Sequence, residues 1–106
     1  MTVFRKGEVW EVAVGSDRYR VLVISSDMFN MDSGLAHLLA MEVRDEPGPY
    51  SVPIPGERGW HVWPAHLDST PKRVCVQRVG SVSLQTLSEA HTRLFMMLHE
   101  STAPHE

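Results

Sequence analysis

The run His66-Leu67-Asp68-Ser69 is the clearest candidate for proton-transfer chemistry in this sequence. An imidazole titrates near neutral pH, so His66 can act as a general base or a general acid. The carboxylate of Asp68 and the hydroxyl of Ser69 are close enough along the chain to orient it. A His-x-Asp-Ser run also arises by chance, and the alternative is a polar loop histidine or one that caps a strand end.

Cationic side chains are unevenly distributed, although the chain as a whole is mildly acidic. Its 106 residues hold 10 Lys and Arg against 13 Asp and Glu, a net charge of −3 at pH 7. This charge argues against a molecule that binds nucleic acid with its whole surface, but it allows a local basic groove. The alternative is that the cations protect strand edges from pairing. They form two groups, Arg5, Lys6, Arg18 and Arg20, and Lys72, Arg73 and Arg78.

The six histidines and the one cysteine do not form a recognisable metal-binding motif. His61 and His66 are separated by a proline-containing stretch, and the sequence has no Cys-x-x-Cys or His-x-x-x-His pair. Zinc sites usually show such local pairs, so we expect no metal and no cofactor. Because Cys75 is the only cysteine, an internal disulfide is excluded and a reducing compartment fits best.

Alternating apolar residues predict a small β protein that must position these groups. The segment Glu8–Val14 alternates with a period of two, and Arg18–Ser25 has a centre that is apolar on both faces, as in a central strand. Asp27–Gly34 has the composition of a loop. The other expected strands are Leu35–Val43, Tyr50–Ile54, Trp60–Trp63 and Val74–Val79, with a Pro-, Ser- and Thr-rich link between the last two.

A C-terminal helix completes the predicted domain. Ser83 is a suitable N-cap, apolar residues from Leu87 to Leu98 follow at helical spacing, and His99 is expected in the last turn. We therefore predict a mainly β domain over residues 1–100, a curled antiparallel sheet covered by this helix, and a frayed tail over 101–106. The continuous apolar run Leu94–Leu98 is too broad for one helix stripe, and this predicts a homodimer.

Trp60 and Trp63 are an odd number of residues apart, which puts them on opposite faces of a regular strand. One is expected in the core, and the other stacks on a nucleic-acid base or lies in a subunit interface. The apolar runs, such as Val21–Ile24, are far shorter than the about 20 residues of a membrane helix. With no apolar signal core at the N-terminus, a cytoplasmic protein without a membrane partner is expected.

Several short motifs resemble the MazF/PemK-type toxins of the MazF/CcdB superfamily. They are Gly7-Glu8-Val9-Trp10, Val21-Leu-Val-Ile-Ser25, Ala65-His-Leu-Asp-Ser69, and Arg78-Val-Gly-Ser-Val-Ser83 with Leu87. The resemblance implies an SH3-like small barrel extended by a helix. It also implies the toxin of a toxin–antitoxin pair, a metal-independent endoribonuclease that cleaves single-stranded RNA to a 2′,3′-cyclic phosphate and a 5′-OH. The implied partner is a cognate acidic antitoxin peptide lying along a groove.

The chain departs from that family where its chemistry is expected. The family's Arg-Pro at the start of strand two is Tyr19-Arg20 here, and a shift of one residue turns the arginine to the opposite strand face unless a bulge intervenes. The family's Thr or Ser at the end of strand three falls near Glu42. The candidate catalytic residues are accordingly Arg20, Arg18 and His66. The candidate RNA-binding residues are Arg5, Lys6, Ser26, Glu42, Asp68 and Ser69.

The CcdB toxins supply an alternative reading. Their second strand is similar to Asp17-Arg-Tyr-Arg-Val-Leu-Val23, and their Ser-Asp continuation matches Ser26-Asp27. CcdB is not a nuclease but traps DNA gyrase with a Trp-Gly-Ile end, which this chain lacks. A non-nuclease toxin that binds gyrase or another protein, or a catalytically inactive relative, therefore stays an open alternative.

Overall fold

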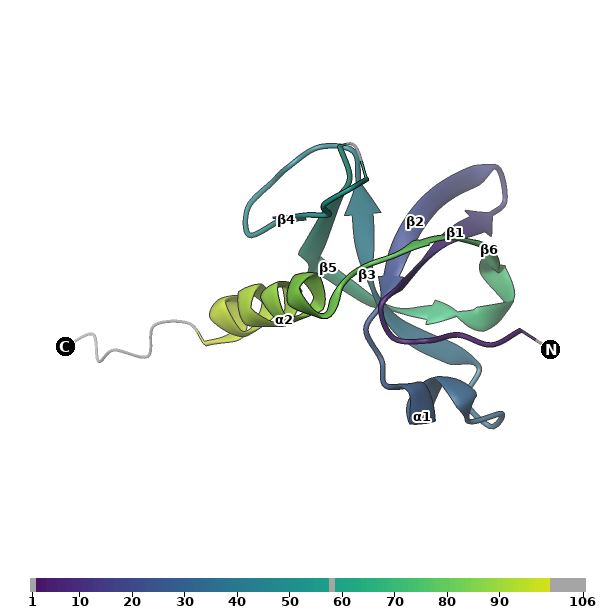
Figure 1. The fold of residues 1–106 in the computed structure, drawn as a ribbon. Coiled ribbons are helices and arrows are strands. Elements are labelled where there is room, and N and C mark those ends of the chain that lie inside the picture. The colour runs from purple at the N-terminus through teal and green to yellow at the C-terminus, as the bar shows by residue number, and fades with distance from the viewer. Residues whose placement is uncertain (1, 58, 100–106) are drawn as a thin grey trace.

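The computed structural model describes residues 2–57 and 59–99, so the predicted tail over 101–106 lies outside the described residues. One antiparallel sheet and a C-terminal helix dominate the chain, as the sequence predicted (Figure 1). The elements are β1 (Glu8–Val14), β2 (Asp17–Val23), α1 (Asp27–Met31), β3 (His37–Arg44), β4 (Val52–Pro53), β5 (His61–Pro71), the 3₁₀ turn η1 (Lys72–Val74), β6 (Cys75–Ser81) and α2 (Leu84–Leu98).

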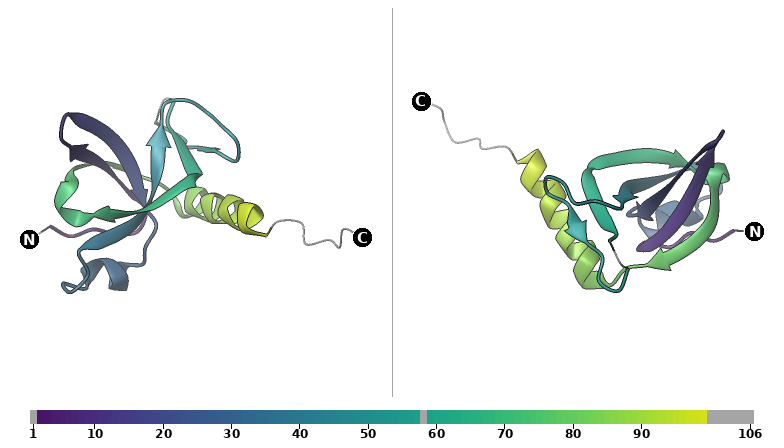
Figure 2. Two further views of the ribbon diagram at one scale, coloured as in Figure 1. Left: turned by 180° about the vertical axis from the view of Figure 1, so that it is seen from behind. Right: turned by 90° about the horizontal axis from the view of Figure 1, so that it is seen from above.

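The six strands follow the order β4-β5-β3-β2-β1-β6, with antiparallel neighbours throughout. The sheet curls strongly, and α2 lies along one side of it beside β5 and β4 (Figure 2). Strand β2 is central, as its doubly apolar sequence predicted, and β4 with its Pro53 is an edge strand. The curl matters for function because it gives the two faces of β2 and β3 different surroundings.

Each face of the central strands contributes to its own apolar core. Residues Val9, Leu22, Met41 and Val43 pack toward α2, where they meet Leu87 and other buried residues. On the opposite face a second core is formed by Phe4, Trp10, Val12, Val21, Val23, Leu38, Ala40 and Cys75. Because side chains alternate along a strand, neighbouring residues of β2 and β3 belong to different cores. The face on which a polar residue lies therefore decides its neighbours.

The segment Asp27–Met31, predicted as a loop, is a short helix. Ser26 caps it, its hydroxyl accepting a hydrogen bond from the Phe29 amide at 3.2 Å. The buried side chain of Asn30 fixes its other side by donating to the Ser25 carbonyl at 3.0 Å. The prediction failed because the turn-forming residues were counted by composition, whereas a cap and one buried amide suffice for a single turn.

Strand β5 is also longer than predicted, since it continues to Pro71 instead of ending at Trp63. The register explains this difference: Met41 pairs with Leu67 while the next residue, Glu42, pairs with Trp63. The extra residues of β5 bulge out of the ladder and accommodate Pro64, whose missing N–H would interrupt a regular strand. The Pro-, Ser- and Thr-rich stretch is thus strand and not a link.

The predicted start of the C-terminal helix is confirmed, and its end is slightly different. The Ser83 hydroxyl accepts from the Thr86 amide at 3.2 Å and caps α2. His99 follows the last turn as the C-cap, donating its backbone N–H to the Phe95 carbonyl at 2.8 Å. Much of the apolar run at this end remains uncovered, with Phe95 59% and Leu98 67% exposed.

Candidate functional site

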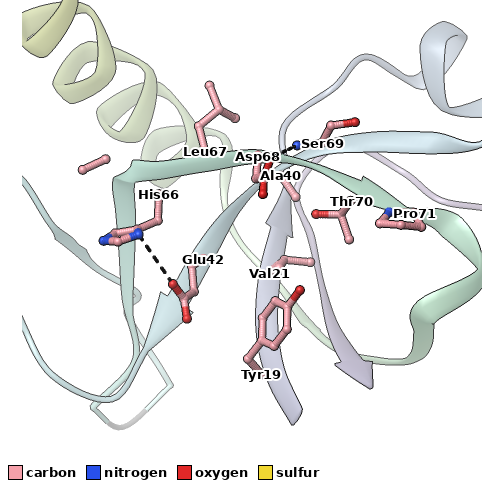
Figure 3. Close-up of a pocket in the computed structure, with 11 residues that line it drawn as sticks. Tyr19, Val21, Ala40, Glu42, His66, Leu67, Asp68, Ser69, Thr70 and Pro71 are labelled. Carbon is pink, nitrogen blue, oxygen red and sulfur yellow. Dashed lines mark hydrogen bonds and ion pairs between the residues drawn. The ribbon is translucent and has the colours of Figure 1, made fainter. Parts of the chain in front are cut away.

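The bulge in β5 brings His66 next to a carboxylate on β3 (Figure 3). The His66 Nδ1 atom lies 3.9 Å from Glu42 Oε1, and the imidazole is 45% exposed. Arg44 donates from its Nη2 to the same Glu42 oxygen at 2.9 Å. From the sequence we predicted that Asp68 and Ser69 orient His66. In the structure, the carboxylate beside His66 is that of Glu42. Asp68 instead accepts from the Ser69 amide at 2.7 Å.

His66 and Glu42 border a pocket of about 450 Å³ on the face of the sheet turned away from α2. Strands β2 and β3 form its floor and β5 forms its wall (Figure 3). Its lining residues are Tyr19, Val21, Ala40, Glu42, Ala65, His66, Leu67, Asp68, Ser69, Thr70 and Pro71. Three of the residues predicted from the sequence to bind RNA, Glu42, Asp68 and Ser69, are therefore gathered around His66.

Tyr19 adds a hydroxyl that the sequence did not predict. Burial raises the pKa of this phenol above its usual value of 10.0, and the negative charges of Glu42 and Asp68, with that of Cys75 once its thiol ionises, raise it further. A phenol with a raised pKa keeps its proton, so Tyr19 is a neutral hydrogen-bond donor in the pocket. The pocket thus combines an imidazole, two carboxylates and a protonated phenol.

Arg18 and Arg20 lie on the other face of the sheet. Strand β2 pairs with both neighbours without a register shift, with Arg20 opposite Glu11 on β1 and opposite Val43 on β3. No bulge in β2 therefore returns either arginine to the face of Tyr19 and Glu42. Arg20 pairs with Asp45 and lies over the Trp60 ring at 4.3 Å.

The structure accordingly does not bring the predicted catalytic arginines together with His66. Arg18 lies 3.5 Å from Glu11 through its Nη1 atom, on the same face as Arg20. The sequence indicated that the displacement of the strand-two arginine by one residue decides which face its side chain occupies. Because the register of β2 is regular, both arginines point away from the pocket.

The remaining predicted RNA-binding residues gather at the start of α1, away from the pocket. Arg5 Nη1 lies 3.9 Å from Asp27 Oδ2, and the Lys6 amide donates to Asp27 Oδ1 at 2.7 Å. Ser26 caps the helix, as described above. Arg5 and Lys6 therefore form a separate cationic surface beside Ser26, and none of the three residues is part of the His66 site.

A second cavity, of about 580 Å³, lies beside that surface. Its walls come from the N-terminal segment, α1, the loop before β3 and η1. Most of the lining is apolar, and Arg5, Lys72 and Arg73 supply cations. The lining residues are Thr2, Val3, Phe4, Arg5, Asn30, Met31, Ser33, Leu35, Ala36, His37, Pro71, Lys72 and Arg73.

Trp63 and Arg44 flank His66, and the sequence did not predict either of them as part of this site. The Trp63 ring lies 5.6 Å from the His66 ring between centroids, and the Arg44 guanidinium lies 4.4 Å over the Trp63 centroid. The spacing in the sequence could have predicted Arg44, because residues two apart in a strand, such as Glu42 and Arg44, lie on the same face. Trp60 and Trp63 lie on opposite faces, as predicted, but both are half-buried, so the expectation of one fully buried core tryptophan was wrong.

Within residues 2–57 and 59–99, no cluster of three or more His, Cys, Asp or Glu side chains is arranged to hold a metal ion. The same described residues contain no helix long and apolar enough to cross a membrane.

Cys75 is a buried thiol outside the His66 chemistry, and it gives a pH prediction. Burial raises its pKa from 9.0 to about 11, so the folded state keeps a proton that the unfolded state loses. The free energy of unfolding should therefore fall as pH rises from 9 toward 11. Urea unfolding of wild type and Cys75→Ser at pH 8, 9, 10 and 11 checks this. A difference between the two proteins that stays constant over this range contradicts the prediction.

This chain resembles known proteins in structure but not detectably in sequence. No protein-family model matches the sequence, and no curated protein is similar to it in sequence. Solved structures do match. An endoribonuclease in complex with its cognate antitoxin from a mycobacterial species has a TM-score of 0.77 and 21% identity, over 92% of this chain and 95% of that chain.

Two structures from Deinococcus radiodurans are also similar. A MazE–MazF complex has a TM-score of 0.76 and 22% identity, covering 95% of this chain and 100% of that chain. MazF by itself has a TM-score of 0.74 and 22% identity, covering 94% of this chain and 100% of that chain. The agreement extends over nearly the whole of each chain, so this protein has the fold of the MazF endoribonucleases.

Proposed function

We propose that this protein is the toxin of a toxin–antitoxin pair and acts in the cytoplasm as a metal-independent endoribonuclease on single-stranded RNA. The observation that carries the proposal is the pairing of His66 with Glu42 beside a pocket that also holds the Tyr19 hydroxyl. The similarity to structures of MazF endoribonucleases supports the same reaction class. The fold by itself does not define the chemistry, so the proposal depends on this pocket.

The proposed reaction is an internal transesterification. His66 removes the proton of a ribose 2′-OH, and the 2′-oxygen attacks the adjacent phosphorus. The bond from phosphorus to the 5′-oxygen breaks, and Tyr19 protonates this leaving oxygen. The products are a 2′,3′-cyclic phosphate and a 5′-OH, and the imidazolium returns its proton to Tyr19 through solvent. Glu42 stabilises the imidazolium because its carboxylate lies 3.9 Å away.

The deciding experiment is incubation of the purified protein with a long RNA in the presence of EDTA. We expect cleavage at discrete sites, and every new end should carry a 5′-OH and a cyclic phosphate. Intact RNA after prolonged incubation would overturn the nuclease proposal. In that case, protein-trapped DNA breaks with purified gyrase would support the CcdB-like alternative, and their absence would favour an inactive relative.

For the partner, we propose an acidic antitoxin peptide that lies in the second cavity. The apolar walls suit apolar side chains, while Arg5, Lys72 and Arg73 complement carboxylates. The presence of MazE in structures similar to this one supports a peptide partner. The peptide encoded by a neighbouring reading frame should bind wild type and should lose affinity for a Lys72→Glu, Arg73→Glu protein. Equal affinities would place the peptide elsewhere.

We also propose a homodimer that covers the exposed end of α2. Large apolar side chains at this end are open to solvent, among them Phe95, Met96 and Leu98. Burial of such surface is the usual source of dimer stability. Analytical ultracentrifugation should show a dimer for wild type and a monomer for Phe95→Glu. A wild-type monomer at micromolar concentration contradicts the proposal.

A further inference from the structure

The His66 pocket has no predicted arginine to hold a phosphate, and its carboxylates oppose one. Cleavage of a phosphodiester places extra negative charge on the phosphate oxygens, and a fixed cation or donor must meet that charge. Glu42 and Asp68 line the pocket, and both repel a phosphate when ionised. Because Arg18 and Arg20 lie on the opposite face, another group must supply the positive charge if this pocket cleaves RNA.

Arg44 is an arginine in direct contact with a residue of this pocket, Glu42. It follows Glu42 by two residues on β3, so the two side chains share one face. Strands β2 and β3 pair Arg20 with Val43, and continuing this register by one residue sets Tyr19 opposite Arg44. Arg44 is not one of the lining residues, but its guanidinium reaches the pocket's edge through Glu42, whose Oε1 it contacts at 2.9 Å.

The contacts of Arg44 hold its guanidinium without using all of its donors. Its plane lies over the Trp63 ring, 4.4 Å from the centroid, and its Nη2 donates to Glu42 Oε1 at 2.9 Å. The side chain is 31% exposed, so substrate can reach it. A guanidinium carries five N–H donors in a rigid fork, and one bond to Glu42 leaves others for phosphate oxygens.

Trp63 connects Arg44 with His66. Its ring is 5.6 Å from the imidazole and also supports the guanidinium, while both the imidazole and the guanidinium lie beside the same oxygen of Glu42. The pairing with Arg44 offsets the negative charge of Glu42, which lowers the repulsion of an incoming phosphate. The imidazole, the carboxylate and the guanidinium therefore form one connected group.

We infer that Arg44, and not Arg18 or Arg20, is the catalytic cation that binds the scissile phosphate in this pocket. The inference rests on the proposed ribonuclease activity and adds a residue to it. Arg20 makes the same kind of arrangement on the other face, where it pairs with Asp45 and lies 4.3 Å over Trp60. The two arginines are therefore a natural pair for comparison, since each combines a tryptophan with a carboxylate.

The test compares RNA cleavage by wild type, Arg44→Gln, Arg44→Lys and Arg20→Gln. Removal of one transition-state donor typically lowers kcat by about 10²- to 10³-fold, and we expect a loss of this size for Arg44→Gln. Arg44→Lys should recover part of the loss, because it keeps the charge but not the fork. Arg93→Gln, a change on α2 outside the pocket lining that removes an ion pair with Glu89 and a hydrogen bond to the Ser51 carbonyl, is the control for loss of an arginine.

A second readout uses an RNA with 2′-deoxyribose at the cleavage site, which binds but lacks the attacking hydroxyl. Loss of one phosphate contact should reduce the slope of log Kd against log salt by about 0.7 for Arg44→Gln. Circular dichroism melting checks that each variant is folded.

The outcomes separate the inference from the proposed function. If wild type cleaves RNA and Arg44→Gln retains full kcat, or if Arg20→Gln loses as much activity as Arg44→Gln, the inference is wrong and the nuclease proposal stands. If wild type cleaves no RNA, both are wrong. Loss of activity confined to the Arg44 variants, with an unchanged salt slope for Arg20→Gln and Arg93→Gln, supports the inference.

Discussion

RNA cleavage by a His66→Ala variant is expected to be slower than wild-type cleavage by about 10²- to 10⁴-fold, the usual contribution of a positioned general base. The structure gives the physical reason, because His66 is the imidazole among the residues that line the pocket and lies 3.9 Å from Glu42. Without it, the 2′-OH proton has no neutral base paired with a stabilising carboxylate. Initial rates on a short fluorescent RNA oligonucleotide measure the effect.

The matched control for this prediction is His99→Ala. His99 is exposed and caps α2 through its backbone N–H, so loss of its imidazole leaves that hydrogen bond in place and removes only a ring contact with Phe95 at 6.0 Å, outside the pocket. Its rate should equal that of wild type. His66→Ala should also melt close to the wild-type temperature, because surface substitutions without buried partners usually change stability by less than about 0.5 kcal/mol. Equal cleavage rates for the two variants would remove His66 from the mechanism.

Gly48→Ala is expected to lower the free energy of unfolding by about 1–3 kcal/mol and to reduce RNA cleavage as well. A Cβ atom at this glycine would lie 2.1 Å from Trp63 Cη2 and 2.5 Å from Trp63 Cζ2. The clash is difficult to relieve, since the Trp63 Nε1–H is bonded to the Glu46 carbonyl at 2.9 Å and the Gly48 amide to the Ser51 hydroxyl at 2.9 Å. Urea unfolding followed by tryptophan fluorescence measures the first effect, and initial rates of RNA cleavage measure the second.

The same clash can be tested by a double-mutant cycle with Trp63→Phe. A phenylalanine has no atoms at the indole positions that collide, so the alanine at position 48 should cost less in this background than in wild type. Additive free energies would show that Gly48 acts through something other than the indole. Cleavage should stay impaired in the double variant, because the Trp63 ring also supports Arg44 and His66.

Much of the fold follows from local sequence patterns. The alternation of Glu8–Val14, the doubly apolar centre of β2 and the Ser83 cap gave two strands and one helix close to their observed places. These predictions succeed because side-chain period and capping are properties of neighbouring residues. The long β5 and the short α1 were missed because each depends on a contact made elsewhere, a bulge opposite β3 or a buried Asn30.

The candidate site was only partly predictable, for a related reason. The sequence alone identified His66, Glu42, Asp68 and Ser69, and it showed that the arginine of the second strand is displaced by one residue. Only the tertiary structure decided that the displacement is not corrected and that Glu42 is the partner of His66. Likewise, only the pairing of β3 with β5 sets Arg44 and His66 against one tryptophan. A strand sequence determines which residues share a face, but the register between strands determines which of them meet.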